Sequence, residues 1–148
     1  MPVPNDRFHL DRVLANLNRV KSDLPKSIAA ETKNYFVREF NDEKWDGKQW
    51  QDVKRKNIKG GSQRNQSHIL VQSGKLRRSL INSLQSADWS SIKFRVVDVP
   101  YARVHNEGLM AGRGAGFKMP KRQFMGDTSA LRKIQREKIT FFIGKIWK

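Results

Sequence analysis

Residues 6–40 have the sequence DRFHLDRVLANLNRVKSDLPKSIAAETKNYFVREF, the longest periodic stretch of the chain. In its first half, apolar residues recur at intervals of three and four between Asp, Arg and Asn, which predicts an amphipathic helix over 6–22. Asn5 or Asp6 is the expected N-cap of this helix. Its apolar face is formed by Leu10, Val13, Leu14, Leu17 and Val20.

Pro25 interrupts this pattern. It fits the first turn of a second helix, where its missing N–H costs no hydrogen bond, with Asp23 as the cap. This second helix is expected to end near Phe40. Its apolar face is formed by Ile28, Ala29, Phe36 and Phe40. The two segments are therefore expected to form one helix with a kink or a short corner.

Two segments lack any periodic pattern. Residues 41–67 are polar and contain several turn-forming Asn, Asp and Gly residues, and residues 107–118 are rich in glycine. Segments of this kind in a compact domain are usually functional or mobile, so we expect mobile loops over both ranges. The large apolar side chain of Trp50 is expected to anchor the first loop to the body of the protein.

The segments between and after these loops suggest strands. Leucines spaced by four over 75–86 fit a helix or one face of a strand, and we favour a strand because Ser and Asn are frequent and Gly74 precedes the segment. Alternating apolar residues over 92–99 predict a second strand. Residues 117–124 are expected to form a short edge strand interrupted by Pro120.

The chain is expected to end in a helix capped by Asp127. Its broad apolar stripe consists of Leu131, Ile134, Ile139, Phe142, Ile143 and Ile146. The order of elements predicts an α+β fold, in which N-terminal helices and the C-terminal helix pack on a small antiparallel sheet. A length of 148 residues is typical of one domain, spanning 1–148.

The chain is strongly basic, with a formal net charge of +16 at pH 7. The excess lies after residue 47, because residues 1–47 carry equal numbers of basic and acidic side chains. Such a surplus predicts a polyanionic partner (nucleic acid, an acidic protein face or a membrane surface) or simply a solvated surface. The candidate contacts to DNA or to an acidic partner are Lys54, Arg55, Lys56, Lys59, Arg64, Arg113 and Lys118.

The sequence contains no pattern that is typical of an enzyme. It has no cysteine, and none of its three histidines has a partner at metal-ligand spacing. Asp98 is the best candidate for a buried carboxylate, with an ion pair to Arg95 or Arg103 as the structural explanation. The triplet His105-Asn106-Glu107 is similar to one in metal-dependent nucleases, but the following helix supplies no further ligand. We therefore expect no enzyme, cofactor or metal, and no membrane span.

Short motifs occur along the chain in a characteristic order. They are Asp46-Gly47-x-x-Trp50-x-x-Val53, Ile69-Leu70-x-x-Ser73-Gly74-x-Leu76-x-x-Ser79, Tyr101-Ala102-x-x-His105-x-x-Gly108 and Met119-Pro120-x-Arg122-x-Phe124-x-Gly126. Together they resemble the virion morphogenesis, or tail completion, family of tailed bacteriophages and Mu-like prophages. The sequence departs from the family pattern at Gln123, where members commonly have proline.

The motif residues are expected to be structural. Gly74 and Gly108 suit positive φ angles, and the planar guanidinium of Arg122 suits a carbonyl or carboxylate clamp. Tyr101 and His105 are expected to satisfy backbone groups at a strand end. The complete set is Trp50, Gly74, Leu76, Tyr101, Ala102, His105, Gly108, Pro120, Arg122 and Phe124.

The resemblance implies a non-enzymatic structural protein that completes the tail or joins it to the head connector. The implied partners are other copies in a ring, with a hexamer expected, and the head-connector and tail-tube proteins. Packaged double-stranded DNA would pass through the ring and be contacted without sequence specificity. The implied location is the neck or tail end of the virion, after synthesis in the host cytoplasm. The alternative is a non-specific double-stranded nucleic-acid-binding protein.

Overall fold

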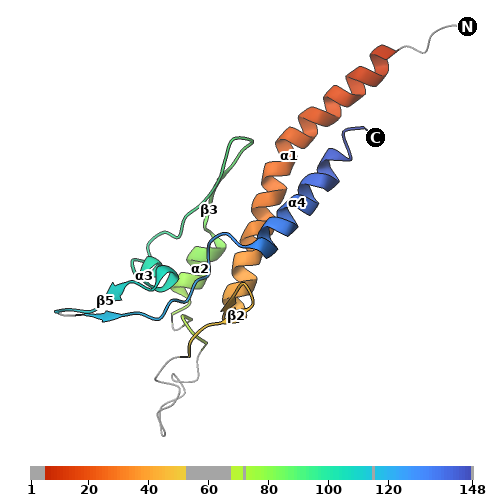
Figure 1. Cartoon of the computed structure of the whole chain (residues 1–148). Coiled ribbons are helices and arrows are strands. Elements are labelled where there is room, and N and C mark those ends of the chain that lie inside the picture. Colours follow the sequence, from red (N-terminus) through yellow and green to blue (C-terminus); the bar gives the residue numbers. More distant parts are fainter. Residues whose placement is uncertain (1–5, 53–67, 72, 115, 148) are drawn as a thin grey trace, which may run out of the picture.

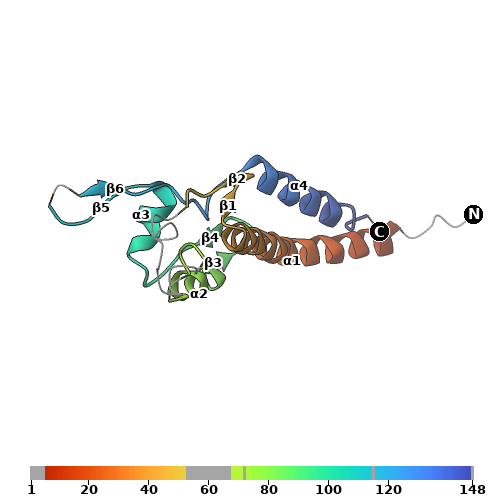
Figure 2. The same cartoon turned by 90° about the horizontal axis from the view of Figure 1, so that it is seen from below.

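The computed structural model describes residues 6–52, 68–71, 73–114 and 116–147. Helix α1 (Asp6–Asn41) is 36 residues long, and helix α4 (Ser129–Ile143) packs along it. These two helices form an arm, while the other elements gather around the C-terminal part of α1 (Figures 1 and 2). The molecule is therefore elongated, and the N-terminal end of α1 and the C-terminal end of α4 point the same way along the arm (Figure 1).

The N-terminal segment forms one continuous helix, and Pro25 lies inside it. The prediction that the two segments form one helix is therefore confirmed, whereas the start of a new helix at Pro25 with Asp23 as its cap is wrong. Proline inside a helix removes one backbone hydrogen bond and costs about 3 kcal/mol. Leu24 and Pro25 are both buried at this point of the arm, and this packing offsets the lost bond.

The segment 75–86 is not one strand, as predicted, but helix α2 (Lys75–Ile81) followed by strand β3 (Leu84–Ala87). Leu76 and Leu80 lie one turn apart on α2, and both are fully buried in the core. Leucines spaced four residues apart form the buried face of a helix here, because α2 packs against α1.

The strands form three separate antiparallel pairs instead of the single small sheet that we predicted. The pairs are β1 (Lys44–Trp45) with β2 (Lys48–Gln49), β3 with β4 (Ile92–Phe94), and β5 (Met110–Ala111) with β6 (Phe117–Lys118). The strands predicted over 92–99 and 117–124 are therefore shorter than expected. The α+β class is confirmed.

Each of the two predicted loops contains one of these hairpins. Asp46 and Gly47 connect β1 to β2 with positive φ angles of 51° and 77°, as a two-residue type I′ turn requires. The glycine-rich segment forms the β5–β6 hairpin, which projects from the body (Figure 1). The mobility of the two segments remains a prediction.

Helix α3 (Tyr101–Glu107) lies where we expected only the end of a strand. It ends at Gly108, whose φ angle of 71° confirms the predicted left-handed conformation. A Cβ atom added there would lie 2.9 Å from Cβ of Lys121, so the chain passes close by at this point. Gly74 precedes α2 with a φ angle of 66°, also as predicted.

The core lies around the C-terminal half of α1. Phe40 is fully buried, and its ring packs edge-on against Trp50 and Phe124 at centroid distances of 5.6 and 5.8 Å. Edge-to-face pairs of this kind stabilise a core beyond the area they bury. The remaining buried members are Tyr35, Phe36, Ile69, Leu76, Leu80, Val99, Ala102 and Leu131.

The N-cap of α4 is Thr128 and not Asp127, as we predicted. The Thr128 hydroxyl accepts a hydrogen bond from the backbone N–H of Leu131 at 3.0 Å and lies 3.2 Å from the Tyr35 hydroxyl of α1. Asp127 instead pairs with Arg132. The start of α4 is thereby fixed to α1.

Candidate assembly surfaces

The motif residues converge on one structural junction. Trp50 is buried, and its indole N–H donates to the carbonyl of Gln123 at 2.8 Å. Arg122 is 4% exposed and donates to the carbonyls of Gln51 and Asp52 at 3.0 and 3.4 Å. These contacts are of the kind that we predicted for Trp50 as an anchor and for Arg122 as a carbonyl clamp. Together they fasten the segment after β2 to the segment before α4.

The other motif residues lie around this junction or at its edge. Leu76, Ala102 and Phe124 are buried members of the core. Pro120 is half-buried beside Arg122, in a hollow that also includes Phe117. Tyr101 is exposed on α3, so the structure gives it no place in the core.

Asn106 completes the junction, and sequence reasoning gave it no such role. Its side-chain carbonyl accepts hydrogen bonds from the backbone N–H groups of Phe124 and Met125, both at 3.0 Å. The backbone N–H of Arg122 also donates to the carbonyl of His105 at 2.8 Å. The triplet that is similar to a nuclease motif therefore connects α3 to the chain that leads into α4.

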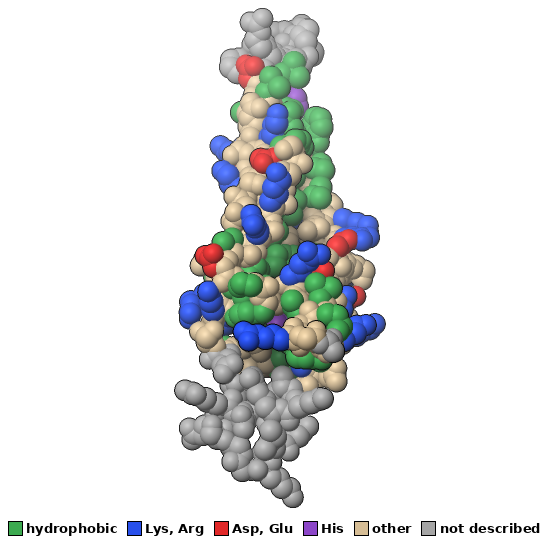
Figure 3. Space-filling view, turned by 90° about the vertical axis from the view of Figure 1, so that its left-hand side faces the viewer, with side chains coloured by type: hydrophobic (Ala, Val, Ile, Leu, Met, Phe, Trp, Pro, Cys, Tyr) green, Lys and Arg blue, Asp and Glu red, His purple; other side chains and the backbone are tan. Residues whose placement is uncertain are grey.

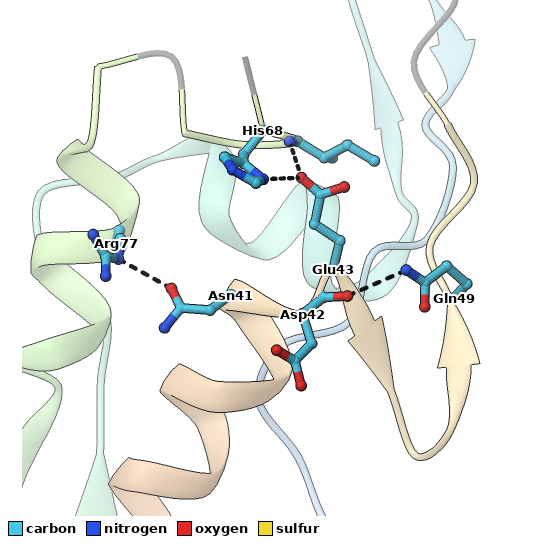
Figure 4. Close-up of polar contacts among 7 residues, drawn as sticks. Asn41, Asp42, Glu43, Gln49, His68 and Arg77 are labelled. Carbon is cyan, nitrogen blue, oxygen red and sulfur yellow. Dashed lines mark hydrogen bonds and ion pairs between the residues drawn. The ribbon is translucent and has the colours of Figure 1, made fainter. Parts of the chain in front are cut away.

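A second junction surrounds the end of α1 (Figure 4). The carboxylate of Glu43 accepts hydrogen bonds from the backbone N–H of Ile69 and from His68 Nδ1. Asn41 accepts a hydrogen bond from Arg77 of α2 at 3.1 Å. Glu43 and Asn41 thus hold the segment 68–71 and α2 against α1. No local sequence pattern indicates these roles, because the partners lie 26 and 36 residues away in the chain.

His105 is half-buried on α3, and its ring packs edge-on against Tyr101. Burial lowers the pKa of His105 from its usual 6.5, and the charge of Arg122 lowers it further. The folded state therefore binds a proton at His105 less readily than the unfolded state does. The contribution of neutral His105 to stability is present above pH 6.5 and is lost as the pH falls toward the lowered pKa.

We therefore expect the chain to be less stable at pH 5.5 than at pH 7.5. Chemical denaturation followed by circular dichroism measures this difference, and His105→Gln should reduce it because the amide does not titrate. An identical pH dependence in the variant and the natural chain would contradict the assignment to His105.

Within the described residues, no three His, Cys, Asp or Glu side chains lie close enough to hold a metal ion. Asp98 is exposed and not buried as predicted, and Arg103 pairs with Glu107 instead. No helix in the described part of the chain is long and apolar enough to cross a membrane.

The candidate basic contacts divide into two groups. Lys54, Arg55, Lys56, Lys59 and Arg64 lie outside the described residues. Arg113 and Lys118 are both exposed on the β5–β6 hairpin. Lysine and arginine side chains also surround the apolar patches on the body in Figure 3. The described surface therefore presents positive charge at the end of the molecule that carries this hairpin.

The arm carries an exposed apolar groove of about 520 Å³ between α1, α4 and the turn of the β3–β4 hairpin. Leu17 of α1, Trp89 of the turn and Ile143 of α4 line it and are 42%, 58% and 48% exposed. The other apolar lining residues are Val20, Leu24, Pro25, Ile28, Ile92, Ile139 and Ile146. We call this surface the arm groove.

A second apolar surface lies at the opposite end of the molecule, on the β5–β6 hairpin (Figure 2). Met110 and Phe117 are 60% and 57% exposed, and Leu109 at the base is also exposed. Soluble monomers rarely expose large apolar patches without a partner. The arm groove and the hairpin are therefore candidate contact surfaces.

Most of the motif residues lie in structural junctions, and the exposed apolar surfaces lie apart from them, one on the arm and one on the β5–β6 hairpin. The sequence model of the phage virion morphogenesis family matches residues 7–140, and the chain belongs to this family. No curated protein and no solved structure matched the chain in the corresponding searches. Membership gives the chain a structural role in the phage virion, in contact with other virion components.

Proposed function

We propose that the chain completes the phage tail or joins it to the head connector, as a non-enzymatic component of the neck or tail end. The observation that carries this proposal is the pair of separate exposed apolar surfaces, one on the arm and one on the β5–β6 hairpin, in an elongated member of the virion morphogenesis family. The proposed partners are the head-connector and tail-tube proteins and further copies of the chain.

The proposed arrangement of the copies is a ring. The two apolar surfaces consist of different elements, so a contact between them joins unlike faces of neighbouring copies. Repeated contacts between unlike faces give a closed ring when the rotation closes and an open fibre when it does not. A ring, with a hexamer as the expected form, leaves a central passage for double-stranded DNA.

Quantitative mass spectrometry of purified particles tests this function. The proposal predicts the chain in intact particles at about six copies, far below the number of major capsid and tail-tube subunits. Separated tails or heads should retain it, because a joining component binds both structures. Absence of the chain from purified particles would contradict the proposal.

A second candidate function is non-specific binding of double-stranded DNA by the free chain. The net charge of +16 and the exposed Arg113 and Lys118 favour it. Binding through phosphate contacts weakens steeply with salt, by several orders of magnitude between about 50 and 200 mM for a protein with many such contacts.

The assembly function predicts only weak duplex binding by the isolated chain, which disappears near physiological salt. Fluorescence anisotropy of a labelled duplex across a salt series measures this. Tight binding that persists at physiological salt would favour the DNA-binding function instead.

A further inference from the structure

We propose that the β5–β6 hairpin of one copy docks into the arm groove of a second copy. This inference rests on the proposed function, because it assumes that identical copies of the chain assemble. It identifies the two surfaces through which neighbouring copies make contact. The docked residues are Met110 and Phe117 on one copy and the groove around Trp89 on the other.

The arm groove needs an apolar occupant. Ten of its lining residues are apolar, and only Asp88, Ser90 and Ser91 are polar. Its volume of about 520 Å³ lies in the range that suits a few large side chains. The longest part of the chain outside the described ranges, 53–67, contains only two aliphatic residues, Val53 and Ile58, among many basic and polar ones. That composition makes it a poor occupant of an apolar surface.

The hairpin has the matching chemistry. Met110 and Phe117 present two large exposed apolar side chains on a narrow two-stranded projection. Methionine adapts to irregular apolar surfaces, and aromatic rings dominate the energetics of interfaces. The hairpin therefore offers a compact apolar insert at the end of the molecule where no other described element covers it.

The charges of the two surfaces are complementary. The charged residues of the hairpin, Arg113 and Lys118, are both basic and exposed. Among the described residues, Asp88 is the one charged residue that lines the arm groove. Hydrogen bonds from Ser90 and Ser91 lower the pKa of Asp88, so it is ionised at neutral pH. Opposite charges at the edge of an interface guide encounter and fix the register of two partners.

The shape of the molecule requires a second copy for this contact. The hairpin projects from the end opposite to the N-terminal half of α1 and the C-terminal end of α4 (Figures 1 and 2). The hairpin of each copy therefore docks into the groove of a neighbour. The groove of that first copy remains open for the hairpin of the next copy. This is the heterologous contact from which a ring is built.

Cysteine cross-linking tests the contact directly, because the natural chain contains no cysteine. The test chain carries Arg113→Cys on the hairpin and Ser90→Cys on the groove lining, two exposed positions that leave Phe117 and Trp89 in place, and it is supplied to a phage that lacks its own copy. Purified particles are treated with a short bismaleimide and separated on a denaturing gel. The matched control carries Arg113→Cys with Lys133→Cys, an exposed position on α4 outside the groove lining.

The proposal predicts a ladder of dimers and higher multiples, at a yield about tenfold above that of the control pair. A yield no higher than the control, in particles that contain the chain, overturns the docking contact and leaves the proposed function standing. Particles that assemble normally without the chain would overturn the proposed function itself and this contact with it.

A charge test provides an independent readout on purified full-length chain. Lys118→Glu places like charges opposite Asp88 and should weaken self-association about tenfold in analytical ultracentrifugation. In a chain that also carries Asp88→Asn, the same change should weaken self-association much less, because no negative charge then faces the introduced glutamate. Equal effects in the two backgrounds, or no self-association in the natural chain, would overturn the contact.

Discussion

Replacement of Trp50 by alanine is expected to destabilise the chain by about 3–5 kcal/mol. The indole ring is buried and packs edge-on against Phe40, so its removal leaves a cavity at the centre of the core. The change also removes the donor to the carbonyl of Gln123, 2.8 Å from the indole nitrogen. Urea denaturation followed by circular dichroism measures the loss.

Two controls separate the contributions of Trp50. Trp50→Phe keeps most of the apolar area and loses the hydrogen bond, so its cost should be smaller than that of the alanine variant. Trp89→Ala removes an indole that is 58% exposed and should change stability little. An unchanged denaturation midpoint in Trp50→Ala would show that the loop anchor assigned to this residue is wrong.

Deletion of residues 110–116 is expected to preserve the fold and to lower the yield of joined, infectious particles by about a hundredfold or more. The deletion removes strand β5 and the turn that connects it to β6. Leu109 and Met119, whose backbone groups are hydrogen-bonded at 3.0 Å, remain and can be joined by a two-residue turn of Phe117 and Lys118. The core contacts of Phe124 are unaffected.

This prediction is measured by plaque counts and electron microscopy of a phage complemented with the deleted chain. Circular dichroism of the purified variant checks that the fold is retained. Lys133→Ala, an exposed change on α4 away from both apolar surfaces, should give the natural particle yield. A normal yield from the deletion would show that the hairpin has no part in assembly.

The existence of the two long helices could be predicted from the sequence, but the unbroken course of α1 at Pro25 and the N-cap of α4 could not. The apolar repeats of α1 and α4 are long enough to identify the 3.6-residue period without other information. Pro25 was predicted to begin a new helix because proline is disfavoured inside a helix. The helix continues through it, and the burial of Pro25 and its neighbour Leu24 offsets the cost. Thr128 caps α4 in place of Asp127, and its hydroxyl also lies 3.2 Å from the Tyr35 hydroxyl of α1, a contact that no local pattern reveals.

The short elements were harder to predict. Leucines spaced by four in α2 fit two structures equally well, and only the packing against α1 distinguishes them. The β1, β2, β5 and β6 strands are two residues long, too short to show an alternating pattern. They were therefore hidden in segments that we predicted as loops.

Some residues of the two junctions could be predicted from the sequence, and others could not. Trp50 and Arg122 could be singled out because a large aromatic and an arginine in a motif have few structural uses. Asn106 and Glu43 could not, because each binds backbone groups of a distant segment. The arm groove is assembled from three elements far apart in the chain, so its existence became visible only in the structure.

The most direct test of the proposed function is a cryo-electron microscopy reconstruction of the neck and tail end of the intact particle. The proposal predicts a ring of copies of this chain where the tail meets the head connector, with the α1–α4 arm recognisable in each subunit. Density for the chain only in the capsid shell or at the far tip of the tail would contradict it.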